Sequence, residues 1–162
     1  MWRQFGAALE MLGNAVRACP AELWGAGGRR APEFWYVVYH TLFFTDLYLS
    51  GSAEGFAPPA PYTLDELDPA GVMPGRVYAK EELLDYLRRC REKCRATVRG
   101  LTAERARALC VFRWGEVSFA ELLLYNLRHV QHHAGQLNLM LRQETDAAPG
   151  WVCSAEGRER GA

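Results

Sequence analysis

The spacing of apolar positions along the chain predicts four long helices. In each of them apolar residues recur every three or four positions, and no stretch alternates between apolar and polar residues for long. The predicted helices cover residues 2–18, Pro32 to Gly51, 80–99 and 118–144. Their ends carry the expected signals, since Gly100 follows the third helix and Ser118 with Glu121 forms a capping box at the fourth. The pattern is typical of an all-α protein.

Residues 52–78 form a long connection between the second and third predicted helices, rich in proline and glycine. A loop of this length is uncommon unless it is functional or disordered. Its apolar side chains predict a loop that packs on the helices, and they are Phe56, Tyr62, Leu64, Leu67, Val72, Met73 and Tyr78. Because such a connection can cross a bundle from end to end, we expect a four-helix bundle with the order up-down-down-up.

The chain is expected to form one domain, because 162 residues suffice for a single core. The domain covers residues 1–144, with a helical turn and a short extended piece expected within residues 101–117. Residues 145–162 are expected to form a loose tail that docks only through Trp151 and Val152.

Composition and charge narrow the classes of function. Lys and Arg together number 19, as do Asp and Glu, so the net charge is zero. The chain thus lacks the excess of positive charge that is typical of proteins binding nucleic acid or anionic lipid. The most apolar stretch, residues 34–49, contains His40 and Asp46, which are costly in a bilayer, so it predicts a buried helix. No export signal is recognisable at the N-terminus. We expect a cytoplasmic protein without nucleic-acid or membrane partners.

The five cysteines are predicted to be free thiols, because their number is odd and none forms a C-x-x-C pair. Cys90 and Cys94 complete a stripe at three- and four-residue spacing, together with Leu83, Leu87, Val98 and Leu101. A free cysteine behaves as a small hydrophobe, so this stripe predicts core packing rather than a redox pair.

Three of the four histidines lie in "LLYNLRHVQHHAGQLN", residues 123–138. At 100° per residue, His133 falls among the apolar positions of this helix and His129 at their edge, whereas His132 points to the rim. Asn126 and Gln136 flank the inward pair. His129 and His133, one turn apart, are therefore the predicted inward couple.

The second predicted helix brings in the fourth histidine. The same projection turns His40 inward, close to Phe44, and sends Trp35, Tyr39 and Asp46 to the opposite side. Helices of a bundle lie about 8–10 Å apart, so imidazoles from two of them can converge on one ion. Two helices thus present three imidazoles to one interior.

Three imidazoles in this arrangement favour a metal site. Neutral imidazole is the commonest metal ligand, and an i,i+4 pair lets two rings occupy adjacent coordination positions. Three protein ligands with a fourth position left to water are typical of catalytic zinc, although nickel, iron or copper would also fit. The other interpretation stays open: His40 and His133 would be core histidines satisfied by Asn126 or a tyrosine hydroxyl, with His129 and His132 at the surface.

On these residues the chain resembles the DinB family, also called the DinB/YfiT-like metalloenzymes. The resemblance rests on His40, on the His129-x-x-x-His133 pair and on the run "HHAGQL", preceded by "FRWGEVSFAE", and it extends to about Arg142. It implies one divalent ion held by the three histidines. Ala134 stands where many relatives have a larger or basic residue, a difference that leaves the ligand set unchanged.

The resemblance also implies a thiol S-transferase or isomerase with a low-molecular-weight thiol as cosubstrate. A divalent cation lowers the pKa of a coordinated thiol or water, which creates a nucleophile at neutral pH. The electrophile would sit against Tyr36, Phe44 and the 52–78 loop, although these aromatics are equally consistent with core packing. Hydrolysis by a metal-bound water is the nearest alternative among enzymes, but the chain lacks H-E-x-x-H, and no general base is identifiable.

The alternative from another class is a non-enzymatic metal- or ligand-binding bundle. An enzyme should show a pocket open to solvent beside His129, whereas a structural site should be closed by a fourth side chain such as His132. The expected partner is a small-molecule ligand or substrate, and a homodimer is an expected assembly because 49% of the residues are hydrophobic.

Overall fold

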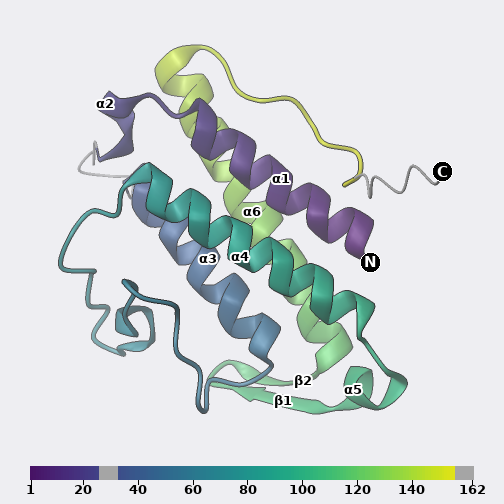
Figure 1. The fold of residues 1–162 in the computed structure, drawn as a ribbon. Coiled ribbons are helices and arrows are strands. Elements are labelled where there is room, and N and C mark those ends of the chain that lie inside the picture. The colour runs from purple at the N-terminus through teal and green to yellow at the C-terminus, as the bar shows by residue number, and fades with distance from the viewer. Residues whose placement is uncertain (26–32, 156–162) are drawn as a thin grey trace.

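The computed structural model describes residues 1–25 and 33–155, which form long helices with short elements between them (Figure 1). In chain order the elements are α1 (Trp2–Ala18), α2 (Ala21–Trp24), α3 (Phe34–Ser50), the 3-10 turn η1 (Asp65–Leu67), α4 (Lys80–Arg99), α5 (Ala103–Arg107), β1 (Leu109–Phe112), β2 (Gly115–Ser118) and α6 (Phe119–Thr145). The predicted start of the second helix at Pro32 lies outside the described residues. The other helix ends were predicted to within one residue.

Local chemistry explains where the long helices begin and end. The Ser118 hydroxyl accepts a hydrogen bond from the backbone N–H of Glu121 at 3.2 Å, the N-cap contact expected from the capping box. α3 stops at Gly51, whose φ of 83° is the left-handed conformation that favours glycine. A Cβ at Gly51 would also lie 2.7 Å from Nη2 of Arg105.

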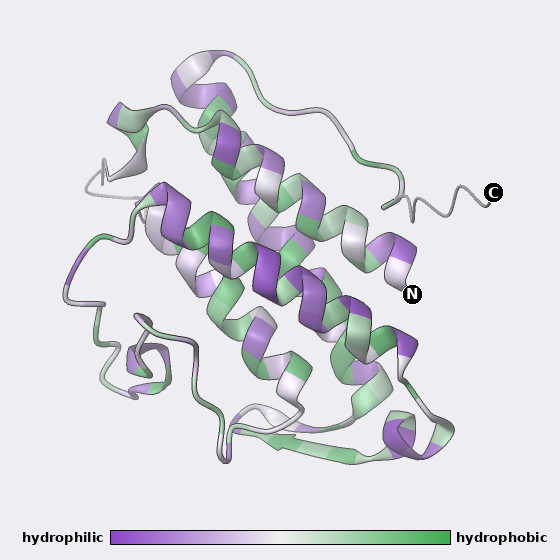
Figure 2. Cartoon of the chain, viewed as in Figure 1, coloured by the Kyte–Doolittle hydropathy of each residue, from purple (hydrophilic) through white to green (hydrophobic). Residues whose placement is uncertain are grey.

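The core is formed where α1 and α3 each pack against both α4 and α6. Cys90 and Cys94 of α4 are buried in it with Leu83 and Leu87, and all five cysteines are free, as predicted. Hydrophilic residues run along the face of α4 turned toward the viewer in Figure 2. The up-down-down-up order expected for these helices stays a prediction.

A small sheet corrects the prediction of a purely α-helical chain. β1 and β2 pair antiparallel, with Leu109 opposite Ser118 and Phe112 opposite Gly115. The expected helical turn is α5, and the expected extended piece is this hairpin. The ring of Trp114, in the hairpin turn, stacks on Tyr125 of α6 at 4.5 Å, which holds the sheet against the helix.

The 52–78 loop is anchored by its tyrosines. Tyr62 and Tyr78 are buried, and the Tyr62 hydroxyl donates to the Glu82 carbonyl at 2.7 Å. The expectation of a packed loop is wrong for three of its apolar residues, which are about half exposed: Leu64, Val72 and Met73. The loop is therefore held at a few points rather than along its whole length.

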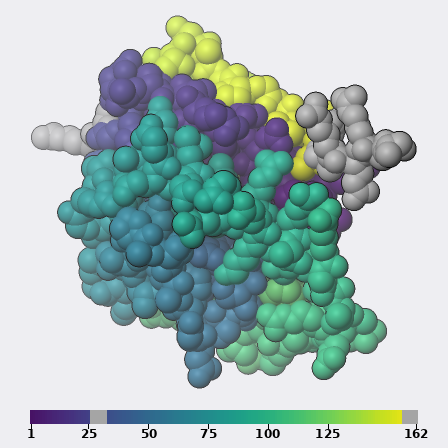
Figure 3. Space-filling view, viewed as in Figure 1, coloured from purple at the N-terminus to yellow at the C-terminus, as the bar shows by residue number. Residues whose placement is uncertain are grey.

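The C-terminal segment docks differently from the prediction. Trp151 is 68% exposed, whereas Ala155 is fully buried and its N–H donates to the Arg3 carbonyl at 2.8 Å. Gly6 has no side chain, and this leaves the space on α1 that Ala155 fills. Figure 3 shows the segment, in yellow, lying against α1, in purple. Of the two residues expected to dock, only Val152 packs partly on the core.

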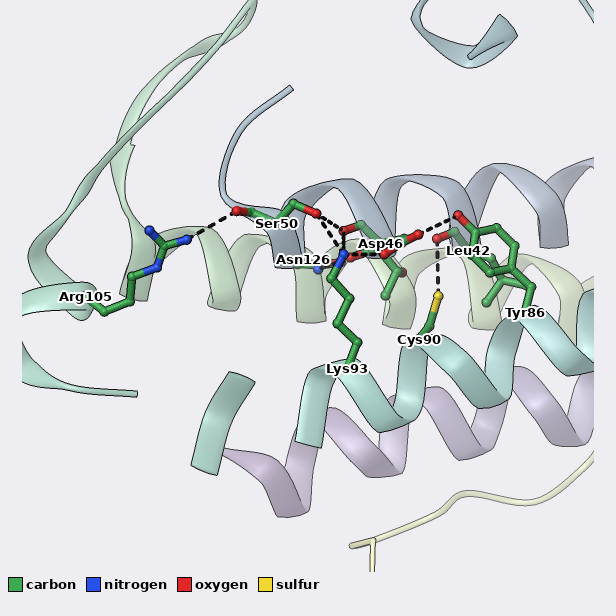
Figure 4. Close-up of polar contacts among 9 residues, drawn as sticks. Leu42, Asp46, Ser50, Tyr86, Cys90, Lys93, Arg105 and Asn126 are labelled. Carbon is green, nitrogen blue, oxygen red and sulfur yellow. Dashed lines mark hydrogen bonds and ion pairs between the residues drawn. The ribbon is translucent and has the colours of Figure 1, made fainter. Parts of the chain in front are cut away.

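The face of α3 opposite His40 is buried rather than exposed. Asp46 lies there as predicted, but it points to α4, where its carboxylate accepts from the Tyr86 hydroxyl at 3.0 Å and pairs with Lys93 (Figure 4). Lys93 Nζ also donates to the Ser50 hydroxyl at 2.8 Å. This partly buried polar cluster joins α3 to α4 on the side away from the histidines.

No helix among residues 1–25 and 33–155 combines the length and the apolar character that crossing a membrane requires. The apolar stretch of α3 instead lies in the core of the protein.

Candidate metal centre

Three histidines from two helices meet at one point between α3 and α6. The ring centroid of His40 lies 5.4 Å from that of His129 and 5.0 Å from that of His133, and the two α6 rings are 4.6 Å apart. One ring nitrogen from each residue lies within 4.8 Å of the others. The three predicted residues are thus brought together, and they could hold a metal ion.

The register of α3 against α6 places these rings. Asn126, one turn before His129, is fully buried, and its side-chain N–H donates to the Thr45 carbonyl of α3 at 3.0 Å. It was expected to stand beside the imidazoles, but its side-chain N–H contacts the α3 backbone instead. Asn126 therefore fixes how the two helices meet, which sets the spacing between His40 and the α6 pair.

Glu66 of the 52–78 loop touches the site, and sequence reasoning missed it. Its Oε2 lies 2.7 Å from Nδ1 of His40, and its side chain is only 4% exposed. A carboxylate on the far nitrogen of a histidine is the usual partner of a metal ligand. The signal available was the acidic run "DELD" in a loop expected to pack, but nothing in the run selects Glu66 over Asp65 or Asp68.

His133 has a partner of its own. Nδ1 of His133 lies 2.7 Å from Oε1 of Gln136, so Gln136 stands beside the site as predicted. For both His40 and His133, the engaged Nδ1 leaves Nε2 as the ring nitrogen for a ligand. In contrast, Nδ1 of His129 is buried and has no hydrogen-bond partner within the described part of the chain.

Burial keeps the α6 pair neutral. It lowers the pKa of His129 to about 3, and the neighbouring His133 and His40 lower it further. Burial also lowers the pKa of His133 to about 4, while the hydrogen bond with Gln136 opposes the shift. A metal ligand must be a neutral imidazole, so the residues fit a divalent cation: two are held unprotonated, and one has an orphaned buried nitrogen.

Aromatic rings surround the three imidazoles. The Phe44 ring lies 4.8 Å from His40 and 6.0 Å from His129, and Tyr48 lies 6.1 Å from His129. Tyr36 lies 6.2 Å from His40, as expected, and burial together with the Glu66 carboxylate raises its pKa to about 12. Its hydroxyl therefore stays protonated at neutral pH and can donate a hydrogen bond beside the site.

The site is reachable from solvent. The His40 side chain is 30% exposed. His129 also borders a hollow of about 460 Å³ on α6, which is lined by Tyr125, Leu127, Arg128, His129, Gln131 and His132. A pocket beside His129 was expected, but Tyr36 and Phe44 do not line this one. His132 is exposed, as predicted, and is not part of the ligand group.

Comparisons with known proteins gave one family model and one solved structure of similar fold. The family model of the DinB superfamily matches residues 4–137. A solved structure of a DinB-like protein, YjoA from Bacillus subtilis, superposes with a TM-score of 0.65 at 15% sequence identity, covering 92% of this chain and 95% of that one. Such low identity shows a shared fold alone. No curated protein matches the chain.

Proposed function

The chain belongs to the DinB superfamily, and we propose that it is a divalent-metal-dependent enzyme whose ion is held by His40, His129 and His133. One observation carries the proposal: three imidazoles from two helices place a ring nitrogen each within 4.8 Å of one another. The other interpretation of the sequence placed His129 at the surface, whereas its Nδ1 is buried and has no hydrogen-bond partner among the described residues.

The openness of the site favours an enzyme over a structural or storage protein. Among the described residues, no fourth histidine, cysteine or carboxylate joins the ligand group. Three protein ligands with a free position are typical of catalytic zinc, whereas structural sites have four. The exposed part of His40 provides access for a small molecule.

The reaction we propose is S-transfer from a low-molecular-weight thiol. A bound divalent cation would lower the pKa of a coordinated thiol, with zinc as the first choice and nickel or iron as alternatives. The three imidazoles would hold the ion, Gln136 would orient His133 through its Nδ1, and the rings of Phe44 and Tyr48 lie beside His129 as aromatic surface next to the site. The thiolate sulfur would form a bond to the electrophilic carbon as the leaving group departs, and the thiol proton passes to solvent.

Several further features belong to the same proposal. The partner is a small molecule, and neither nucleic acid nor membrane is expected, because the net charge is zero. We also propose a cytoplasmic location and a homodimer. Hydrolysis by a metal-bound water remains the alternative reaction at the same three ligands.

Cobalt substitution tests the proposed function. Cobalt(II)-loaded protein should develop a sulfur-to-cobalt absorption band in the near ultraviolet when 2-mercaptoethanol or cysteine is added, because a free coordination position accepts thiolate. The loaded protein should then speed the reaction of the thiol with 1-chloro-2,4-dinitrobenzene, in which a C–S bond forms and chloride leaves. His132→Ala is the matched control, since His132 is outside the ligand group.

The possible outcomes separate the candidate functions. A cobalt spectrum that does not change with thiol would contradict S-transfer. Cleavage of an activated ester without thiol chemistry would indicate the hydrolase. Cobalt binding with neither reaction would support the non-enzymatic metal-binding bundle instead.

A further inference from the structure

Glu66 is a buried carboxylate that contacts His40 and interacts with the Tyr36 hydroxyl. Its side chain is 4% exposed, its Oε2 contacts Nδ1 of His40, and its Oε1 is buried without a hydrogen-bond partner in the described part of the chain. Burying a charge costs free energy unless other groups compensate it. Packing of a hydrophobic core does not explain a buried carboxylate on a loop. The position of Glu66 therefore indicates that a positively charged group binds at the histidine site.

We propose that Glu66 is a positioning residue for His40, and that docking of the 52–78 loop and metal binding strengthen each other. The inference rests on the proposed metal site. When Glu66 accepts a hydrogen bond from Nδ1–H of His40, the ring is held in the tautomer whose Nε2 lone pair is free for the ion. A cation at the three imidazoles would in turn compensate the charge of the buried carboxylate.

The loop is held in place by contacts that do not involve the three imidazoles. The Tyr39 hydroxyl donates to the Thr63 carbonyl at 3.2 Å. The Tyr62 hydroxyl donates to Glu82 on α4, and the Tyr62 ring stacks on Tyr86 at 4.4 Å. The 3-10 turn that carries Glu66 begins only two residues after Thr63. These anchors therefore determine where the Glu66 carboxylate stands relative to His40.

Coupling between the loop and the ion must be reciprocal. If docking of the loop raises the affinity for the metal, then the metal stabilises the docked loop by the same factor. Two kinds of measurement follow from this: metal affinity in loop variants, and protection of the loop by metal.

Metal affinity in variants of Glu66 is the first test. Glu66→Ala should weaken zinc binding about 10–100-fold in competition with a chromophoric chelator, the usual effect of losing such a partner. Glu66→Gln keeps an oxygen that can accept from Nδ1–H, so it should lose less. Asp65→Asn, in the same turn but bonded to Thr63 rather than to a histidine, is the matched control and should bind as the wild type does.

Anchor variants and hydrogen exchange provide the second test. Tyr62→Phe removes the hydrogen bond to Glu82 and should also weaken zinc binding, although Tyr62 is outside the ligand group. In the wild type, zinc should slow exchange of the Leu67 and Asp68 amides, which donate within the turn. In Glu66→Ala the same amides should show no such protection. Circular dichroism of each variant confirms that the helices are intact.

The outcomes distinguish failure of the inference from failure of the proposed function. If the wild type binds zinc and Glu66→Ala binds it equally well, the positioning role is wrong while the metal site stands. Zinc binding without any change in exchange at Leu67 and Asp68 would overturn the coupling. A wild-type chain that binds no divalent metal would overturn both proposals.

Discussion

Replacing Asp46 by alanine should destabilise the protein strongly without affecting metal binding. Asp46 is buried on the side of α3 that faces α4, and its carboxylate accepts from Tyr86 and pairs with Lys93 (Figure 4). The substitution leaves the Tyr86 hydroxyl buried without an acceptor. It also leaves Lys93 without its charge partner.

The magnitude follows from how deeply each partner is buried. Tyr86 is 1% exposed, and an orphaned buried donor of this kind costs about 1–3 kcal/mol. The Lys93 side chain is 38% exposed, so solvent screens its ion pair with Asp46. Losing this pair adds roughly 0.2–1 kcal/mol. We expect a total of about 3 kcal/mol, which lowers the melting temperature of a domain of this size by roughly 6–12 °C.

A double-mutant cycle measured by urea denaturation isolates the contact. Tyr86→Phe alone should cost about 1 kcal/mol, because the carboxylate keeps Lys93. The double variant should be more stable than the sum of the two single losses predicts, by about 1–2 kcal/mol, since it has no orphaned hydroxyl. Strictly additive losses, or a loss for Asp46→Ala below about 0.5 kcal/mol, would refute the reasoning. A fall in metal content in Asp46→Ala would refute its placement away from the site.

Three other features give simple tests. Gly6→Ala would place a Cβ 2.6 Å from that of Ala155 and should release the C-terminal segment, so the Ala155 amide should exchange faster. Adding Ala155→Gly should restore the slow exchange of this amide. An unchanged exchange rate in Gly6→Ala would contradict the docking of the segment. Ellman's reagent should modify one thiol quickly and none in Cys153→Ser, because the other four are buried and burial raises the pKa of Cys19 to about 11. Rapid modification of a second thiol would contradict that burial. Zinc at 100 times its Kd should raise the free energy of unfolding of the wild type by about 2.7 kcal/mol, and a chelator should reverse this gain. The stability of His133→Ala should not change with zinc. Equal stabilisation of the wild type and the variant would argue against the site.

Helical periodicity accounts for what could be predicted of the fold and the site. The repeat of 3.6 residues per turn places His129 and His133 on one face of a helix wherever that helix packs, so the pair could be assigned without a structure. The capping residue Ser118 likewise marks the start of α6 locally. Asp46 shows the limit: its direction was correct, but α3 is buried almost all round, so facing away from His40 meant facing α4 rather than solvent.

Contacts made by loops could not be predicted, because they have no period. Glu66 reaches His40 across 26 positions of sequence through an irregular loop, and its acidic neighbours have the same local pattern. The C-terminal segment docks through Ala155, a small residue that fits the space over Gly6, whereas the larger Trp151 stays exposed. A prediction from size and hydrophobicity alone therefore chose Trp151 as the docking residue instead of Ala155.

The most direct test of the metal site is elemental analysis by plasma mass spectrometry of untagged protein purified without chelator. The wild type and His132→Ala should each contain about one divalent ion per chain, and His40→Ala and His133→Ala should contain none, because each removes one of three ligands. Unchanged metal content in the last two variants, or its loss in His132→Ala alone, would contradict the assignment of the ligands. No metal in the wild type, even after reconstitution, would contradict the site itself.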